Sequence, residues 1–411
     1  MTDCCSAPGL TPFEVALEQL LSQVNVTQKT QLIPLEQACG RVLAQDIISE
    51  MQIPSADNSA MDGYAIRSAD LINTNTLKQI GKVFAGHPLD QVIEAGQCVR
   101  IMTGGQIPAG CDAVVMQENT QSENDDIIFL KSATVGDNIR RAGEDISIGQ
   151  TLLTIGRRLS PSDIGLLASL GVARVNVFEK LNVAVISTGD ELQVPANPLK
   201  PGQFYESNGY TVSALLERFG VNVINFGIVP DNMAQLKETF IQADAQADIV
   251  ITSGGVSVGE ADYTKSVIEE LGRIDFWKLA IKPGKPFAFG HLSNSYVIGL
   301  PGNPVSALVT LHQLAVPMMR KISGQKVKAP LRLNAINAKK LHKRPGRMDF
   351  QRGYFSVNEN GNLEVQATGA QGSGILTSMS QANCYIVLPQ DSGNVDSGET
   401  VMIEPFDALL E

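Results

Sequence analysis

The sequence lacks any apolar run long enough to cross a membrane, and Met1–Thr11 lacks the basic start and apolar stretch of a signal peptide. Positive charge is also in short supply, because 32 Lys and Arg stand against 43 Asp and Glu, which gives a formal net charge of −11. This balance argues against a general nucleic-acid binder, although it leaves room for a local anion site. We therefore predict a cytoplasmic protein with no membrane and no nucleic-acid partner.

Cysteine and histidine are few and scattered. None of the 6 cysteines falls in a CxxC pair, and the 4 histidines show no zinc-ligand spacing. We therefore expect reduced, mostly buried thiols and no histidine-based metal site. The adjacent Cys4 and Cys5 fit a frayed N-terminal tail better than a metal site.

The length of 411 residues is too great for one hydrophobic core, and the sequence pattern changes along the chain between helical and β-rich stretches. Both observations predict several domains. Residues 10–48 carry helical patterns, with one helix expected at Pro34–Leu43, and residues 146–180 return to mixed helical texture. Between them, residues 49–145 alternate short β-rich runs with Gly, Pro and Asn turns. We therefore expect a discontinuous helical and linker domain, 10–48 with 146–180, that carries the mainly β segment as an insertion.

The second half of the chain predicts an α/β domain followed by a β domain. Residues 181–327 alternate apolar strand-like runs with helical stretches, which indicates a doubly wound, mainly parallel α/β sheet. Residues 328–411 return to short β-rich runs and predict a small C-terminal β domain. The fold class is thus multidomain α/β plus β. The helices expected in the α/β domain are Ser207–Phe219, Met233–Ala245, Thr264–Leu271 and Pro304–Ile322.

Loops with glycines and carboxylates follow the strands of the α/β domain. They are STGDEL at Ser187–Leu192, PDN at Pro230–Asn232 and SGGVSVG at Ser253–Gly259, and the third matches neither a Walker A loop nor GxGxxG. Ligands bind at the carboxyl ends of the strands in such sheets, so three such loops favour a site for Mg²⁺ and phosphate, although each alone could be a plain turn. The candidate Mg²⁺ ligands are Glu191, Asp231 and Asp262, and the candidate phosphate cradle is Ser253, Gly254 and Gly255. Asp262 is also a candidate for a ribose contact or a helix N-cap.

Two further loops of this domain carry cations and a helix start. FWKLAIKPGKP places Lys278, Lys282 and Lys285 on a stretch stiffened by prolines, which suits a diphosphate or an oxyanion and is also compatible with a surface loop. PGNP at Pro301–Pro304 begins a long apolar helix, whose N-terminus either attracts an anion or is only rigidly capped. The basic run Lys339–Arg352 is compatible with a solvated face or with a local positive surface that attracts oxyanions.

Eight motifs occur together in the order DNSAMDGYA, IMTGG, RRAGEDI, STGDEL, YESN, TSGGVSVGEADY, KPGKPFAFG and GLPGNPVSA. Alone, the first two read as turns. In this order the set resembles the molybdopterin molybdenumtransferase family, to which the E domain of gephyrin is related, from about residue 10 to the C-terminus. The resemblance implies an enzyme that inserts molybdenum from molybdate into the dithiolene of adenylyl-molybdopterin and releases AMP, with Mg²⁺ required. No protein nucleophile is needed, because the dithiolene sulfurs capture the molybdenum.

The resemblance also implies a homodimer whose active cleft lies between the α/β domain of one subunit and the β module of the other. An upstream adenylyltransferase is a further partner. From the β module, Asp62 and Thr103 would reach the cleft near Asp145. On the α/β side, the carboxylate set would be Glu191, Asp231 and Asp262, and the anion pocket would be shaped by Lys278, Lys282, Pro301 and Pro304. Molybdate would lie near Lys282, Lys285, Arg352 and Ser373.

The sequence departs from the family pattern at two places. Gly105 and Gln106 follow IMTG, where the family commonly has Ala and then a small residue or Pro. Asn232 follows Asp231 where an Asp-Asp pair is common. Two other functions stay open: a molybdopterin adenylyltransferase, and a non-catalytic molybdopterin-binding scaffold.

Overall fold

The computed structural model describes residues 9–254 and 263–410. The chain divides into two compact units, each with its own buried apolar clusters. The first unit consists of the described residues of Met1–Ala44, Gly156–Ser160 and Arg174–Glu411, and the second consists of Gln45–Ile155 and Pro161–Ala173. The finer four-domain division stays a prediction.

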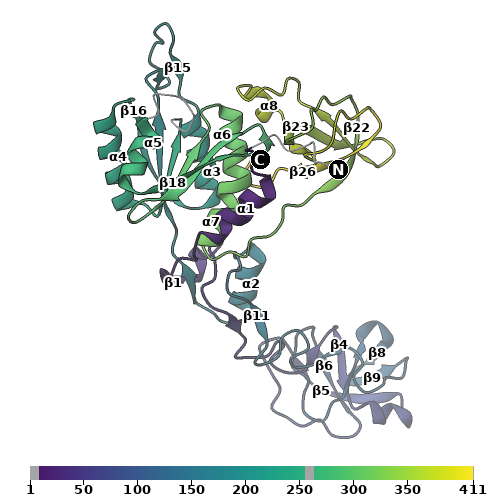
Figure 1. Ribbon diagram of the computed structural model, residues 1–411. Coiled ribbons are helices and arrows are strands. Elements are labelled where there is room, and N and C mark those ends of the chain that lie inside the picture. The colour runs from purple at the N-terminus through teal and green to yellow at the C-terminus, as the bar shows by residue number, and fades with distance from the viewer. Residues whose placement is uncertain (1–8, 255–262, 411) are drawn as a thin grey trace, which may run out of the picture. The chain divides into compact units, whose positions relative to one another are not determined.

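A six-stranded sheet in the order β16-β13-β17-β21-β20-β18 forms the α/β part of the first unit (Figure 1). The first four strands run parallel, β20 runs antiparallel to them, and β18 runs antiparallel to β20, so the predicted mainly parallel sheet is confirmed. The strands are β13 (Asn182–Thr188), β16 (Asn222–Val229), β17 (Ile249–Ser253), β18 (Arg273–Lys278), β20 (Pro286–His291) and β21 (Tyr296–Leu300).

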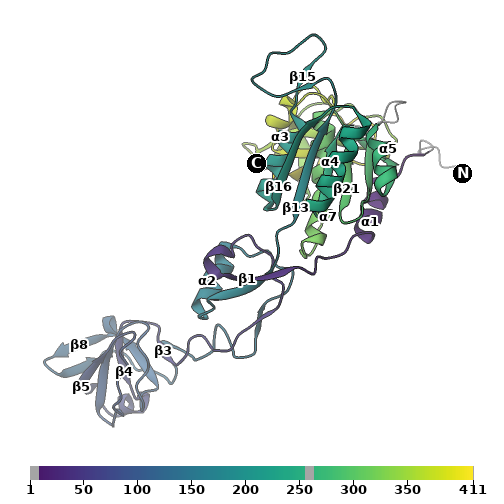
Figure 2. The same cartoon turned by 90° about the vertical axis from the view of Figure 1, so that its left-hand side faces the viewer.

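Helices cover both faces of this sheet because its strands are apolar on both sides. On β13, Val183 and Val185 share a buried cluster with α1, α3, α6 and α7, whereas Ala184 and Ile186 share another with α4 and α5. Figure 2 shows β13 and β16 between α3 and α4. The helices are α1 (Phe13–Ser22), α3 (Asn208–Phe219), α4 (Met233–Gln246), α5 (Tyr263–Leu271), α6 (Pro304–Thr310) and α7 (Val316–Ile322), the last two joined by a π-helical turn at Leu311–Ala315.

The four helices predicted in the α/β domain are present, each with bounds within one residue of the expected ones. The helix expected at Pro34–Leu43 was wrong, since only a 3-10 turn at Leu35–Gln37 forms there. The reason is a non-local pairing. Strand β1 (Thr30–Pro34) lies antiparallel to β12 (Arg174–Phe178), and this extended backbone runs up to the predicted helix start.

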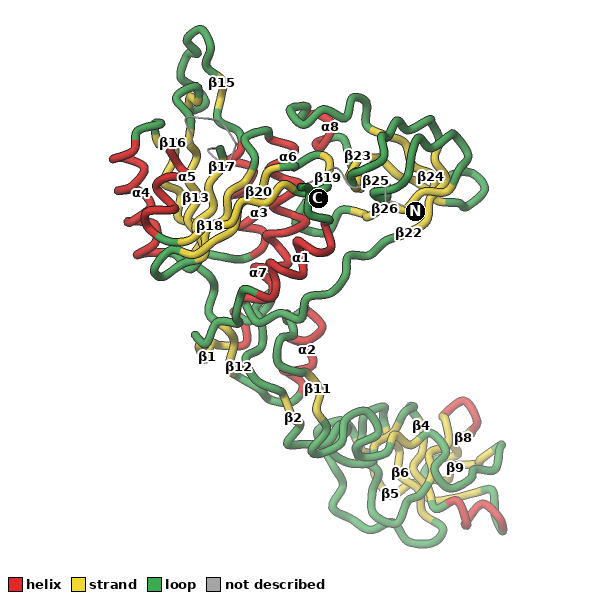
Figure 3. Tube along the Cα trace, in the orientation of Figure 1, coloured by secondary structure: helices red, strands yellow, loops and turns green. Residues whose placement is uncertain are grey.

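The C-terminal part of the first unit is a small closed barrel. Its strands follow the order β23-β24-β22-β26-β25, and β25 pairs back with β23 (Figure 3). The two-residue strand β19 (Ile281–Lys282) of the KPGKP loop adds to β23 in parallel. The barrel elements are β22 (Leu333–Asn337), β23 (Met348–Val357), β24 (Leu363–Ala367), α8 (Thr377–Ser380), β25 (Cys384–Leu388) and β26 (Thr400–Pro405).

The second unit is mainly β. Its six-stranded sheet has the order β7-β4-β6-β5-β9-β8, and two short pairs, β3 with β10 and β2 with β11, flank it. Tyr64 and Ile66 of β4 are buried in one cluster, whereas Ala65 is buried in another, so both faces of the sheet are covered. The bounds are β2 (Ile47–Ile48), β3 (Asn58–Ser59), β4 (Gly63–Ile66), β5 (Thr76–Val83), β6 (Gln97–Ile101), β7 (Ala113–Met116), β8 (Thr120–Glu123), β9 (Asp126–Phe129), β10 (Ile139–Arg140), β11 (Thr151–Leu153) and α2 (Pro161–Ser169).

A last pair, β14 (Leu192–Gln193) with β15 (Phe204–Tyr205), links the STGDEL loop to the YESN motif. Within residues 9–254 and 263–410, no helix is long and apolar enough to span a membrane.

Candidate active site

The carboxyl ends of the four parallel strands lie level with one another. In the register of the sheet, Thr188 of β13 lies opposite Val229 of β16, and Ser187 lies opposite Ser253 of β17. Ser253 in turn lies opposite Leu300 of β21. The loops that follow these strands therefore share one edge of the sheet, which is the usual ligand site in a doubly wound fold.

Three carboxylates gather at this edge. The Asp231 amide donates a hydrogen bond to Asp190 Oδ1 at 3.1 Å, which joins the PDN loop to the STGDEL loop. Partial burial of Asp231, and then the charges of Asp190 and Glu191, raise the pKa of the Asp231 carboxyl. Asp231 thus has a second carboxylate beside it, although from another strand, and the neighbouring Asn232 instead caps α4 by accepting from the amides of residues 234 and 235.

The phosphate cradle begins in a backbone turn that requires glycine. Gly254 has a φ of +90°, and a Cβ there would lie 2.6 Å from the carbonyl oxygen of Thr188. The Thr188 hydroxyl beside it is buried and has no hydrogen-bond partner among the described residues. Ser253 is buried at the end of β17. The described part of this loop therefore offers a close backbone approach and a hydroxyl that a ligand can satisfy.

The start of α6 is tied to two other loops. Pro304 lies in the first turn of α6, and Pro301 is buried just before it. Asn208, at the start of α3, donates through Nδ2 to the carbonyl of Gly302 at 2.8 Å. The amide of Val305 donates to the carbonyl of Ser373 at 3.0 Å. The predicted residues Pro301, Pro304 and Ser373 are thus close together, and the C-terminal barrel supplies the last of them.

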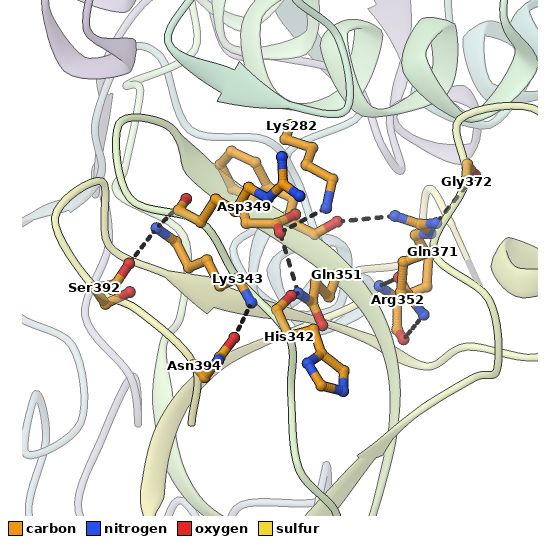
Figure 4. Close-up of polar contacts among 12 residues, drawn as sticks. Lys282, His342, Lys343, Asp349, Gln351, Arg352, Gln371, Gly372, Ser392 and Asn394 are labelled. Atoms are coloured by element: carbon orange, nitrogen blue, oxygen red, sulfur yellow. Dashed lines mark hydrogen bonds and ion pairs between the residues drawn. The ribbon is translucent and has the colours of Figure 1, made fainter. Parts of the chain in front are cut away.

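The three predicted lysines differ in their surroundings. Lys278 ends β18, Lys285 precedes β20, and both are exposed. Lys282 lies on β19, and its Nζ is 3.3 Å from Oδ2 of Asp349 on β23 (Figure 4). Asp349 was not among the predicted site residues. The signal for it was a carboxylate between apolar residues in RMDFQ, within the basic run Lys339–Arg352.

Arg352 is fully buried and holds a loop in place. Its guanidinium donates to the hydroxyl of Ser378 at 3.0 Å and to the carbonyl of Gly372 at 3.2 Å. Its backbone exchanges hydrogen bonds with the side chain of Gln371. In this structure Arg352 therefore acts on the neighbouring Ser373 loop, and its guanidinium does not reach solvent.

In the second unit, Asp62 and Thr103 are in direct contact. Both the amide and the hydroxyl of Thr103 donate to Asp62 Oδ1, each at 2.8 Å. These two bonds, the amide first, lower the pKa of the Asp62 carboxyl, and the charge of Arg100 adds to the effect. Arg100 itself lies over the ring of Tyr64 at 5.1 Å and donates to the carbonyl of Gly63. Both residues are exposed, and the Asp62 carboxyl is ionised at neutral pH.

The RRAGEDI segment packs against the DNSAMDGYA segment. Asp57 pairs with Arg141 at 2.6 Å and accepts from the amide of Ala142. The amide of Asp145 donates to the carbonyl of Ile53, and its side chain is exposed. Asp57 and Arg141 were not predicted as site residues, although both belong to the motifs that carry the resemblance.

Two predicted residues, Gly255 and Asp262, lie outside the described residues. Within the described ones, no group of three His, Cys, Asp or Glu side chains has the arrangement of a complete metal site. A divalent cation would nevertheless offset the burial and the like charges that raise the pKa of Asp231, and Mg²⁺ is commonly held by one or two carboxylates together with substrate phosphates. The donor set at Asp190, Glu191 and Asp231 fits that mode of binding.

Three family models match the chain in succession. The MoeA N-terminal region (domain I and II) matches residues 11–171, a probable molybdopterin binding domain matches residues 184–321, and the MoeA C-terminal region (domain IV) matches residues 334–406. The fold and its sheet-edge loops are thus those of a molybdenum cofactor biosynthesis protein.

Known proteins agree over nearly the whole length. The molybdopterin molybdenumtransferase of Haemophilus influenzae is 51% identical, over 97% of this chain and 99% of that protein. The Dictyostelium discoideum gephyrin is 33% identical, over 96% of this chain and 62% of that protein. A crystal structure of the molybdopterin biosynthesis MoeA protein from Pyrococcus horikoshii has a TM-score of 0.83 at 32% identity and covers 97% of this chain and 100% of that one. The chain belongs to the molybdopterin molybdenumtransferase family.

Proposed function

We propose that this protein is a molybdenum-inserting transferase, which takes molybdate and adenylyl-molybdopterin and yields molybdenum cofactor and AMP. The observation that carries the proposal is that Asp190, Glu191 and Asp231 lie at the same edge of the sheet as the Gly254 turn, in a chain of this family. A substrate with a diphosphate-like linkage needs both carboxylates that bind a cation and a backbone turn that binds phosphate. Cations stabilise the charge on the departing AMP, and the backbone turn approaches its phosphate closely.

Each group at this edge has a role in the proposal. Glu191 and Asp231, with Asp190 and Asp262, hold Mg²⁺, which neutralises the phosphate oxygens when bound. The turn at Ser253 and Gly254 binds the phosphate. The exposed Lys278 and Lys285 offset the remaining negative charge, and the α6 N-terminus after Pro301 orients the anion.

Molybdate, a dianion, binds where Lys282 and Lys285 meet the barrel, next to Ser373. Arg352 is a positioning residue for that loop, because its guanidinium bonds the carbonyl of Gly372. The two dithiolene sulfurs bind molybdenum in place of a molybdate oxygen, which leaves as water with the protons of the thiols, and a water molecule cleaves the linkage to AMP. The protein therefore supplies orientation and charge and no nucleophile.

The test is incubation of the purified protein with adenylyl-molybdopterin, molybdate and Mg²⁺, with AMP release and active cofactor as readouts. Asp231→Asn should abolish both. Glu217→Gln, the same charge change on an exposed side chain near the far end of α3, should change neither. An adenylyltransferase would instead consume ATP and release pyrophosphate. A scaffold would bind the pterin without turnover and would tolerate Asp231→Asn. Either result would refute the proposal.

We further propose a homodimer in which the Asp62 set and the Asp231 set of one cleft come from different subunits. Co-expression of Asp62→Ala and Asp231→Ala chains tests this. Each variant alone should be inactive, whereas the mixed dimer contains one cleft with both carboxylates and should recover up to about half of the wild-type activity per mixed dimer. No recovery, with mixed dimers shown to form, would contradict the shared cleft.

A further inference from the structure

The C-terminal barrel carries a cavity beside the KPGKP loop. It has a volume of about 630 Å³, within the range of small-molecule sites. Five of its lining residues, Lys282, His342, Lys343, Arg344 and Arg347, are basic, and one, Asp349, is acidic. Figure 4 shows Lys282, His342, Lys343 and Asp349 gathered around it. Of these residues, only Lys282 and its partner Asp349 were described with the active site above.

Two of the cations are not engaged by the protein. The Nζ of Lys343 is already hydrogen-bonded within the protein, because it donates to the carbonyls of Ser392 at 2.8 Å and Gln390 at 3.2 Å. In contrast, the side chains of Arg344 and Arg347 make no hydrogen bond or ion pair with any residue that the structure describes. Their guanidinium groups, one exposed and one half-buried, are therefore available to the anionic group of a ligand.

Asp349 has one oxygen without a partner. The residue is 2% exposed, and its Oδ2 accepts from Lys282 at 3.3 Å and from Gln351 at 3.1 Å. Its Oδ1 has no hydrogen-bond partner among the described residues. A buried carboxylate oxygen left unpartnered is costly, so this atom calls for a donor.

These contacts discriminate between two kinds of ligand. Molybdate, the inorganic oxyanion that the proposed function supplies, has no donor at neutral pH, so it would leave Oδ1 unpartnered and would be repelled by the Asp349 charge. It would also fill only a small part of the cavity. An organic anion that carries N–H donors satisfies both the carboxylate and the guanidinium groups.

We propose that this cavity binds the pterin end of the substrate, with the 2-amino group of the pterin donating to Asp349 and the anionic side arm at Arg344 and Arg347. The identity of the ligand rests on the proposed function, since that function supplies a pterin with an anionic arm. Asp349 is then a substrate-binding residue, and Lys282 joins the pterin cavity to the molybdate side.

The experiment is binding of three probes to the full-length protein, measured by calorimetry. Pterin-6-carboxylate has the complete donor edge, whereas lumazine-6-carboxylate has an oxygen in place of the 2-amino group, and molybdate has no donor. The pterin should bind the wild type about tenfold or more tightly than the lumazine, because a donor to a charged oxygen is replaced by an acceptor. Asp349→Asn should remove most of this preference, while the charge-matched Asp391→Asn, at an exposed residue, should keep it.

A second variant keeps the test decisive if Asp349→Asn does not fold. Arg347→Gln, at a half-buried site, should weaken pterin and lumazine equally, by about three- to tenfold, and leave the preference between them intact. Equal binding of pterin and lumazine to the wild type would overturn the proposal. So would tighter molybdate binding in Asp349→Asn with unchanged pterin binding, which would identify an oxyanion site.

These outcomes are separable from those of the proposed function, since binding requires no turnover. A wild type that releases AMP but does not prefer the pterin refutes only the pterin cavity. A wild type that prefers the pterin through Asp349 but releases no AMP refutes only the transferase.

Discussion

Asp62 and Thr103 form a bidentate contact across two loops of the β module, with the amide and the hydroxyl of Thr103 both donating to one carboxylate oxygen at 2.8 Å. The contact fixes the orientation of the carboxylate, because two donors from one residue define its plane and its free oxygen. The other oxygen, Oδ2, has no hydrogen-bond partner among the described residues.

Removing the Thr103 hydroxyl should raise the pKa of Asp62. The two bonds from Thr103 favour the charged carboxylate, and Thr103→Val deletes one of them while the amide remains. The stability linked to this group is present above the unfolded pKa and is lost as pH falls through the lowered folded pKa, so the effect belongs to acid pH. A ¹³C NMR titration of the carboxyl should show the pKa move up toward 3.8 in Thr103→Val. Thr103→Ser, which keeps the hydroxyl, should titrate like the wild type, and an unchanged Thr103→Val would contradict the assignment.

The pKa of Asp231 is shifted in the opposite direction to that of Asp62, so its contribution to stability should have the opposite pH dependence. Its folded pKa is raised, so its linked stability is fully present below the unfolded pKa of about 3.8 and is lost as pH rises through the folded value. Asp231→Asn should therefore raise the Tm slightly at pH 7 without Mg²⁺, by about 1–2 °C, because an exposed substitution changes stability by no more than about 0.5 kcal/mol.

The same variant has two internal controls. The gain in Tm should vanish below pH 3.8, where the wild-type carboxyl is protonated too. Added Mg²⁺ should stabilise the wild type and leave Asp231→Asn nearly unchanged. A variant that is less stable than the wild type at pH 7 without Mg²⁺ would show that Asp231 is held by favourable contacts and not by like charges.

Gly105 is predicted to be sterically required in the IMTGG loop. A Cβ on Gly105 would lie 2.9 Å from the carbonyl oxygen of Met102 and 3.0 Å from the side chain of Ile101. Gly105→Ala should cost about 1–3 kcal/mol in urea unfolding and should displace Thr103. The matched control is Gly165→Ala in α2, where a Cβ meets nothing within 4 Å and should stabilise by about 0.5–1 kcal/mol. Equal behaviour of the two variants would show that the IMTGG loop adapts freely.

The α/β domain could be predicted from sequence because its signals are local. Periodic helices such as Pro304–Ile322 and strands followed by glycine turns reveal both the elements and the edge at which ligands bind. The failures have a non-local cause. A helix was predicted after Pro34 because nothing in the local sequence indicates the pairing of β1 with β12.

The same limit applies to the candidate site. Asp231 and Glu191 were identified from their places after strands, but the hydrogen bond to Asp190 depends on how two loops fold over the edge. The Lys282 to Asp349 pair depends on β19 joining a strand 67 residues later. Residue type and spacing thus predict which edge carries the chemistry, whereas the partners that position each charge come from tertiary pairing.

Arg352 should order the Ser373 loop through the geometry of its hydrogen bonds and not through its positive charge alone. The buried guanidinium bonds three acceptors in fixed directions, Ser378 Oγ, Phe350 O and Gly372 O, which the single ammonium of a lysine cannot reproduce. Arg352→Lys should cost about 2–4 kcal/mol and should loosen the loop whose Ser373 carbonyl accepts from the Val305 amide. Hydrogen exchange should report this as faster exchange at Val305. Arg273→Lys, at a side chain that is 82% exposed, should change neither stability nor exchange. Unchanged exchange at Val305 in Arg352→Lys would mean that the loop is held by Gln371 alone, and that the positive charge of Arg352, not its geometry, is what the site uses.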